Sequence, residues 1–117
     1  MKFTQSLKKN KDFQQVYKEG KSFANKYLVM YVLKNDSEKN RLGISVSKKV
    51  GNSVHRHRLS RLIRENYRGL EEKYPRGLDI VVVARVNSKG IGYKEVGSAL
   101  NHLGKLHGIF AKEVSGE

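Results

Sequence analysis

The chain has 117 residues, which is enough for one domain with a buried core but too few for two such domains. Its 24 Lys and Arg outnumber 11 Asp and Glu, and the formal net charge of +13 indicates an acidic partner, either nucleic acid or an anionic membrane. The chain has no cysteine for disulfides or thiolate zinc sites, no signal segment, and no apolar run of the roughly 20 residues that span a bilayer. We therefore expect a soluble cytoplasmic protein.

The first half of the chain predicts one helix and two strands. A helix is expected over residues 10–19, with Asn10 or Asp12 as its cap, because apolar side chains recur at helical spacing there. A strand rich in β-formers follows at 27–33, and the polar stretch 35–40 predicts a turn.

The next strand, residues 41–47, alternates between two kinds of side chain. One face carries Leu42, Ile44 and Val46, and the other carries Gly43, Ser45 and Ser47. The alternation predicts a sheet with one covered apolar face and one open face, which is floored by small residues with aromatic rings beside them.

The second half of the chain predicts helix, strand and helix. A long helix capped by Asn52 or Ser53 extends to about residue 70 or 74, and the apolar run 78–84 is expected at the centre of the sheet. A last helix is expected over 93–107, followed by a frayed tail after Phe110. The order α-β-β-α-β-α predicts an α+β fold, a two-layer sandwich of helices on a small sheet.

The long helix separates apolar from basic side chains. Its apolar side is formed by Leu59, Leu62, Ile63, Asn66, Tyr67 and Leu70, and its opposite side by Arg58, Arg61, Arg64 and Arg68 with His57. From Lys48 to Arg68 there are seven Lys or Arg and one acid, Glu65. Solvated helices usually alternate charge signs, and arginine suits phosphate, so the pattern favours nucleic acid over a plain solvated face.

A second basic cluster surrounds the aromatic side chains of the first helix. Its lysines are Lys8, Lys9, Lys11, Lys18, Lys21 and Lys26. Aromatic rings among cations are typical of single-strand binding, in which bases stack on the rings. Phe13 and Tyr17 are equally typical of the core face of an amphipathic helix. The polar tips of Tyr17 and Tyr31 favour a place at the edge of a cleft.

Metal and catalytic sites find little support in the sequence. His55 and His57 lie two residues apart on a helix and cannot chelate one metal, and His102 and His107 are also poorly spaced. The acids are scattered, and no nucleophile stands beside a base. The acids Asp12, Asp79 and Glu65 are expected to act as a cap or as salt-bridge partners.

Four segments in order resemble the bacterial ribonuclease P protein family. They are residues 7–13, 42–47, 48–54 and 56–65, and the resemblance extends over about 7–107. It implies one domain, residues 1–117 with a core at about 7–110, of the ribosomal protein S5 domain 2-like type with a left-handed βαβ crossover. It also implies a non-catalytic subunit of an endoribonuclease, whose catalytic RNA removes the 5′ leader from precursor tRNA with Mg2+ held mainly by that RNA.

The resemblance implies two sets of site residues. The RNA-binding set around the signature helix is Lys48, Lys49, Asn52, Arg56, His57, Arg58, Arg61, Arg64 and Arg68. The leader-cleft set is Lys9, Phe13, Tyr17, Tyr31, Ser45 and Ser47. The implied partners are the catalytic RNA and the single-stranded leader, with no membrane, no cofactor bound by the protein alone and no required protein partner.

Two positions depart from the family pattern, which usually has Asn in place of His57 and Lys in place of Ser60. The arginines are intact, so RNA binding is expected to survive, although an imidazole cannot reproduce the paired hydrogen bonds of an amide. The alternative function is a ribosomal or other structural RNA-binding protein. A membrane-surface protein is disfavoured, because the apolar side of the long helix is needed by the sheet.

Overall fold

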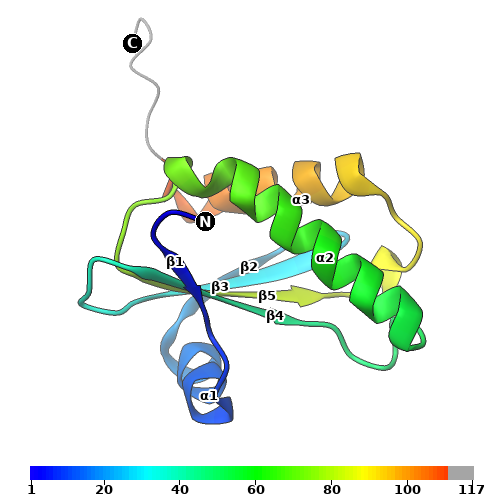
Figure 1. Ribbon diagram of the computed structural model, residues 1–117, viewed down its shortest axis with the longest axis horizontal. Coiled ribbons are helices and arrows are strands. Elements are labelled where there is room, and N and C mark those ends of the chain that lie inside the picture. Colours follow the sequence, from blue (N-terminus) through cyan, green and yellow to red (C-terminus); the bar gives the residue numbers. More distant parts are fainter. Residues whose placement is uncertain (111–117) are drawn as a thin grey trace, which may run out of the picture.

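The structure is a computed structural model, and it describes residues 1–110; the tail expected to fray lies outside these residues. Figure 1 shows a sheet with helices on both faces. The helices are α1 (Asn10–Glu19), α2 (Ser53–Leu70) and α3 (Tyr93–His107), with short 3-10 turns η1 (Glu71–Lys73) and η2 (Val86–Ser88). The strands are β1 (Thr4–Ser6), β2 (Lys21–Ala24), β3 (Leu28–Lys34), β4 (Asn40–Ser45) and β5 (Leu78–Ala84).

The five strands form one mixed sheet in the order β1-β4-β5-β3-β2. β5 lies at its centre, antiparallel to β3 and parallel to β4, as its continuous apolar run predicted. β4 and β5 are parallel neighbours and are joined through α2. The α+β class is confirmed, and the short edge strands β1 and β2 are additions to the predicted order.

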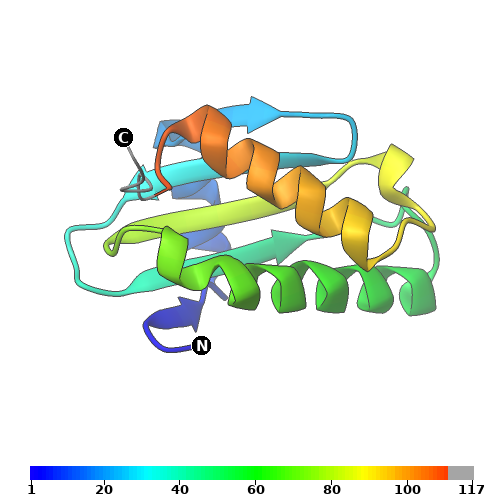
Figure 2. The ribbon, with the colours of Figure 1, turned by 90° about the horizontal axis from the view of Figure 1, so that it is seen from above.

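The helices do not form the expected two-layer arrangement. α2 and α3 lie together over one face of the sheet, and α1 packs against the opposite face (Figures 1 and 2). Two separate clusters of apolar side chains explain this arrangement. None of the helices in residues 1–110 is both long and apolar enough to cross a membrane.

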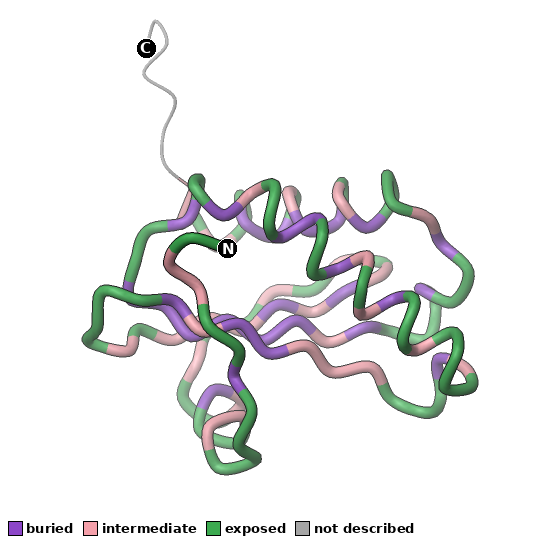
Figure 3. The backbone as a smooth tube through the Cα atoms, in the orientation of Figure 1, coloured by how far each residue is buried: buried purple, intermediate pink, exposed green. Residues whose placement is uncertain are grey.

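The larger cluster lies between the sheet and the α2–α3 pair. It includes Leu28, Met30, Ile80 and Val82 from the strands and Leu100 from α3, all fully buried. The smaller cluster, beneath α1, has Leu7, Val16 and Val81 as its buried members. Figure 3 shows how burial follows the central strands and the inner sides of α2 and α3. α1 therefore covers only part of its face of the sheet.

The helix caps correct one expectation and confirm another. Lys9 is the N-cap residue of α1 and makes no capping hydrogen bond through its side chain, so the expected cap by Asn10 or Asp12 is wrong. Asp12 instead pairs with Arg41 of β4. In α2 the side chain of Asn52 accepts a hydrogen bond from the backbone N–H of His55, at 3.0 Å, as predicted.

The N-terminal segment is fastened to the end of α2 by Glu71. The carboxylate is buried and accepts hydrogen bonds from the backbone N–H groups of Lys2, at 2.8 Å, and Phe3, at 3.1 Å. Burial alone would raise the pKa of Glu71, but the hydroxyl of Thr4 and these two N–H groups lower it below its ordinary value of 4.5. The charged form is thus favoured in the folded protein.

Substituting Glu71→Gln is expected to lower the free energy of unfolding at neutral pH by about 1–3 kcal/mol, because hydrogen bonds to a charged acceptor are lost. Folding lowers the pKa of Glu71, so its stabilisation is fully present above pH 4.5 and is lost as the pH falls below that value. Urea unfolding at pH 7 and pH 3 measures this difference. A variant that is equally destabilised at both pH values would contradict the role of the charge.

Candidate nucleic-acid interface

The solvent side of α2 presents the predicted row of arginines. Asn66 and Tyr67 are buried against the sheet side with the apolar residues, as helical periodicity predicted. The side chains exposed on the opposite side are His57, Arg58, Arg61, Arg64 and Arg68. Lys48, Lys49 and Asn52 are exposed in the connection that leads into the helix. The structure thus brings the predicted RNA-binding residues onto one continuous stretch.

The arginines of α2 differ in what they already bind. Arg58 donates to the backbone carbonyl of Ile91 at 3.1 Å, and Arg68 pairs with Glu65 at 3.4 Å. Within residues 1–110, Arg61 and Arg64 make no hydrogen bond or ion pair through their side chains. These two guanidinium groups are therefore available for an external anion at no cost in internal contacts.

Two depressions flank the ridge formed by His57 and Arg61. One has a volume of about 590 Å3 and is lined by Ser53, Val54, His57, Arg58, Arg61 and Leu62. The other has a volume of about 570 Å3 and is lined by Ile44, Val46, Ser53, Arg56, His57, Ser60, Arg61 and Arg64. Each combines cations with apolar carbon, which suits a nucleic acid that offers phosphates and base faces.

Arg56 differs from the exposed arginines because it turns toward β4 and is only half-exposed. Its Nε is buried and has no hydrogen-bond partner in the described part of the chain. An unpaired buried donor is costly. The Arg56 side chain also lines the second depression. His57 and Ser60, the two positions that depart from the pattern of the family that the sequence resembles, both line this depression.

The predicted cleft residues meet on the other face of the sheet. The rings of Phe13 and Tyr17 lie 6.2 Å apart between centroids, and the ring of Tyr17 packs edge-on against that of Tyr31 at 5.0 Å. All three residues are half-buried, so they belong partly to the smaller core cluster and partly to the surface. The interpretation as core residues is thus correct in part, and the interpretation as binding residues stays a prediction.

Gly43 explains why Phe13 can lie close to the sheet. A Cβ atom at this position would come within 2.6 Å of the Phe13 ring and 3.1 Å of Leu7. The absence of a side chain at Gly43 leaves the space that the ring occupies. Gly43, which was predicted to lie on the open face of the sheet, is therefore covered by an aromatic ring.

Beyond α1 the sheet face remains uncovered, as Figure 1 shows along the strands beside the helix. Ser45 lies on this face, half-buried, two residues beyond Gly43. Ser47 is exposed just after β4, and Lys9 is exposed where α1 begins. The six residues Lys9, Phe13, Tyr17, Tyr31, Ser45 and Ser47 thus lie on or next to this face of the sheet, and we call this set of residues the cleft.

Arg85, which directly follows the central strand, was not among the predicted site residues. A depression of about 340 Å3 at the end of β5 is lined by Val83, Ala84, Arg85, Val86 and Asn87. Arg85 is exposed, and it donates to the backbone carbonyl of Asn25 at 2.8 Å. The sequence feature that could have identified it is a basic residue directly after a buried strand, because residues that follow strand ends at one edge of a sheet lie close together.

The two surfaces lie on opposite faces of β4. Ile44 and Val46 contribute to the depression beside α2, whereas Gly43 and Ser45 face the cleft. Among residues 1–110 there is no group of three or more side chains able to hold a metal ion. The arrangement can bind a folded polyanion along α2 and stack unpaired bases in the cleft.

Comparisons with known proteins agree with this arrangement. Residues 1–107 match the protein family described as Ribonuclease P. The chain is 65% identical over 108 residues to the ribonuclease P protein component of Lachnoclostridium phytofermentans, covering 92% of this chain and 93% of that protein. It is 54% identical over 103 residues to that of Clostridioides difficile, covering 87% and 90%.

Solved structures show the same similarity. The RNase P protein of Staphylococcus aureus superimposes with a TM-score of 0.84 at 40% identity, covering 91% of this chain and 97% of that one. The RNase P protein of Thermotoga maritima superimposes with a TM-score of 0.77 at 35% identity, covering 86% and 96%. With its arginine-lined α2 and matching fold over nearly its whole length, the chain belongs to the bacterial ribonuclease P protein family.

Proposed function

We propose that this chain docks on the catalytic RNA of ribonuclease P through α2 and holds the 5′ leader of precursor tRNA in the cleft. Membership of the family makes it a protein subunit of a tRNA-processing endoribonuclease. The observation that carries the proposal is the exposed arginine side of α2, in which Arg61 and Arg64 have no partner within residues 1–110. Arginines of this kind bind phosphate in a bidentate manner.

The cleft supports the second half of the proposal. Phe13, Tyr17 and Tyr31 offer ring surface on which bases can stack, and Lys9 supplies positive charge for the leader backbone. Ser45 and Ser47 offer hydroxyl groups that can form hydrogen bonds with the same single-stranded leader. This mode of binding tolerates any leader sequence, because every base has a π-face.

We also propose how the protein and the RNA divide the chemistry, and which type of fold the chain has. The protein supplies no catalytic group; the RNA holds Mg2+ and performs the cleavage in the cytoplasm, and no second protein is needed. The whole chain acts as one domain of the ribosomal protein S5 domain 2-like type, and the connection from β4 through α2 to β5 is left-handed, against the usual rule.

A reconstitution tests the function. The protein, its cognate catalytic RNA and a precursor tRNA are combined at low magnesium, and each component is omitted in turn. The protein is expected to restore 5′ cleavage that the RNA alone performs poorly and to cut nothing by itself. If cleavage is unchanged although the protein binds RNA tightly, the alternative of a ribosomal or other structural RNA-binding protein is favoured.

Substituting Tyr17→Ala or Tyr31→Ala is expected to reduce the preference of the holoenzyme for precursor over mature tRNA, with stacking worth about 1–3 kcal/mol per base. Equilibrium binding of the two tRNAs measures the preference. Tyr93→Ala serves as the control, because Tyr93 is 55% exposed at the start of α3 on the other side of the sheet. An unchanged preference in both cleft variants would assign both rings to the core alone.

A further inference from the structure

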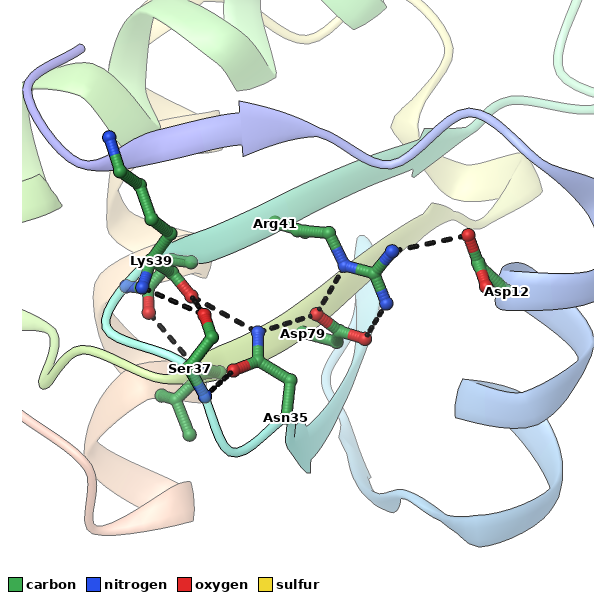
Figure 4. Close-up of polar contacts among 8 residues, drawn as sticks. Asp12, Asn35, Ser37, Lys39, Arg41 and Asp79 are labelled. Atoms are coloured by element: carbon green, nitrogen blue, oxygen red, sulfur yellow. Dashed lines mark hydrogen bonds and ion pairs between the residues drawn. The ribbon is translucent and has the colours of Figure 1, made fainter.

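Arg41 joins three elements through its guanidinium group, next to the cleft (Figure 4). From β4, its Nε and one terminal nitrogen donate to the two carboxylate oxygens of Asp79 in β5, at 2.9 and 2.6 Å. Its other terminal nitrogen donates to Asp12 of α1, at 3.2 Å. One side chain therefore fastens α1 to the two central strands beneath it.

Asp79 fixes the position of that guanidinium group. The residue is only 3% exposed, and a buried carboxylate must be paired. Asn35 donates a further hydrogen bond to it at 2.8 Å, and Asn35 is itself held by the turn at Ser37 and Lys39. Because both oxygens of Asp79 are engaged, Arg41 cannot rotate without losing a contact. The nitrogen that meets Asp12 thus has a defined place.

α1 has few other attachments to the sheet. Of its ten residues only Val16 is buried, and its N-cap residue makes no capping hydrogen bond. Within residues 1–110, Asp12 is the one side chain of α1 that makes a hydrogen bond or ion pair. The remaining contacts are the half-buried rings of Phe13 and Tyr17, which are themselves parts of the cleft.

We propose that Arg41 and Asp12 are positioning residues, which hold α1 at the distance from Tyr31 that leader binding requires. This inference rests on the leader cleft proposed above. Phe13 directly follows Asp12, and Tyr17 lies about one helical turn beyond Phe13. Tyr31 belongs to the sheet, so any release of Asp12 moves both rings of α1 relative to the third.

The charge of Asp12 makes the inference testable by sign. Asp12 is an acidic residue beside the surface proposed to bind the leader, so its negative charge by itself repels the phosphates of the leader backbone. If charge were its only effect, neutralising Asp12 would raise affinity for the leader. If Asp12 positions α1, neutralising it lowers that affinity. The two effects oppose one another, so the direction of the change identifies the role.

The first test compares Asp12→Asn with Glu19→Gln in the reconstituted holoenzyme. Both substitutions remove one negative charge from α1, but Glu19 is exposed and makes no ion pair within residues 1–110. Asp12→Asn is expected to lower the preference for precursor over mature tRNA by about twofold to fivefold, the size of a partly exposed ion pair. Glu19→Gln is expected to keep or raise it, and both should bind the catalytic RNA normally.

The second test uses Arg41→Lys, which keeps a positive charge for Asp79. A lysine ammonium lacks the guanidinium fork and cannot serve both carboxylates. The preference of the Arg41→Lys holoenzyme for precursor over mature tRNA is expected to fall as it does in Asp12→Asn. In the double variant that carries both substitutions, the preference is expected to fall no further than in Arg41→Lys alone. Amide hydrogen exchange in α1 should become faster in both single variants, whereas exchange in α2 stays unchanged.

The outcomes separate this inference from the cleft proposal. If Tyr17→Ala and Tyr31→Ala leave the preference unchanged, the cleft does not hold the leader. If those variants lower the preference while Asp12→Asn raises it or leaves it unchanged, the cleft stands and the positioning role is refuted. Additive losses in the Asp12 and Arg41 double variant would also refute it, because the two residues would then act separately.

Discussion

Replacing Arg61 and Arg64 together by alanine is expected to weaken binding to the catalytic RNA by about 10- to 100-fold at moderate salt. Both side chains are exposed and have no internal partner within residues 1–110, so their loss removes external contacts and leaves the fold intact. Each lost phosphate contact should also reduce the slope of log affinity against log salt by about one unit. Filter binding over a range of salt concentrations measures both quantities.

The matched control removes two charges elsewhere. Lys94 and Lys105 are exposed on α3, and replacing both by alanine gives the same net charge as the double arginine variant. This control is expected to change the salt slope much less, because general attraction at a distance is screened by salt. Equal losses in the two double variants would mean that total charge, and not the α2 surface, determines docking.

Replacing Asn40 by alanine is expected to produce the largest loss of stability, about 2–4 kcal/mol. Asn40 is fully buried at the start of β4. Its amide nitrogen donates to the carbonyl of Pro75 at 3.0 Å, and its amide oxygen accepts from the N–H of Leu78 at 2.9 Å. Alanine leaves the buried N–H of Leu78 and the partly buried carbonyl of Pro75 without their partner. A thermal unfolding midpoint lowered by about 10 °C or more would report the change.

Asn87→Ala is the control for that experiment. Asn87 is exposed after β5 and makes no side-chain hydrogen bond within residues 1–110, so its substitution should change stability by less than about 0.5 kcal/mol. If Asn40→Ala is as stable as this control, the backbone groups of Pro75 and Leu78 must find other partners. The connection into the central strand would then not depend on Asn40.

The elements predicted with correct boundaries are those with strong periodicity and clear stop signals. α1, β5 and α3 begin and end where expected, and Pro75 with Gly77 separates the long helix from the central strand. β1 and β2 were missed because strands of three and four residues carry too little pattern. Their pairing depends on partners elsewhere in the chain, which a local pattern cannot indicate.

The candidate site was predictable to the extent that it follows one helix. Helical spacing alone placed the arginines of α2 on one side. It could not show that Arg58 is occupied by the carbonyl of Ile91, because that contact joins segments far apart in sequence. For the same reason it left Asp12 as either a cap or a salt-bridge partner, and the structure shows the salt bridge, with Arg41 of β4. The side of the sheet chosen by α1 likewise depends on contacts between distant residues.

The position of β5 at the centre of the sheet has a consequence for biosynthesis. β3 and β4 follow one another in the chain, yet neither pairs with the other, and both pair with β5. A nascent chain that has not reached Leu78 therefore lacks the strand that unites the sheet. Contacts of such long sequence separation form slowly. The basic sequence of α2 leaves the ribosome before its scaffold exists, so ordered recognition of RNA begins only after the last third of the protein is made.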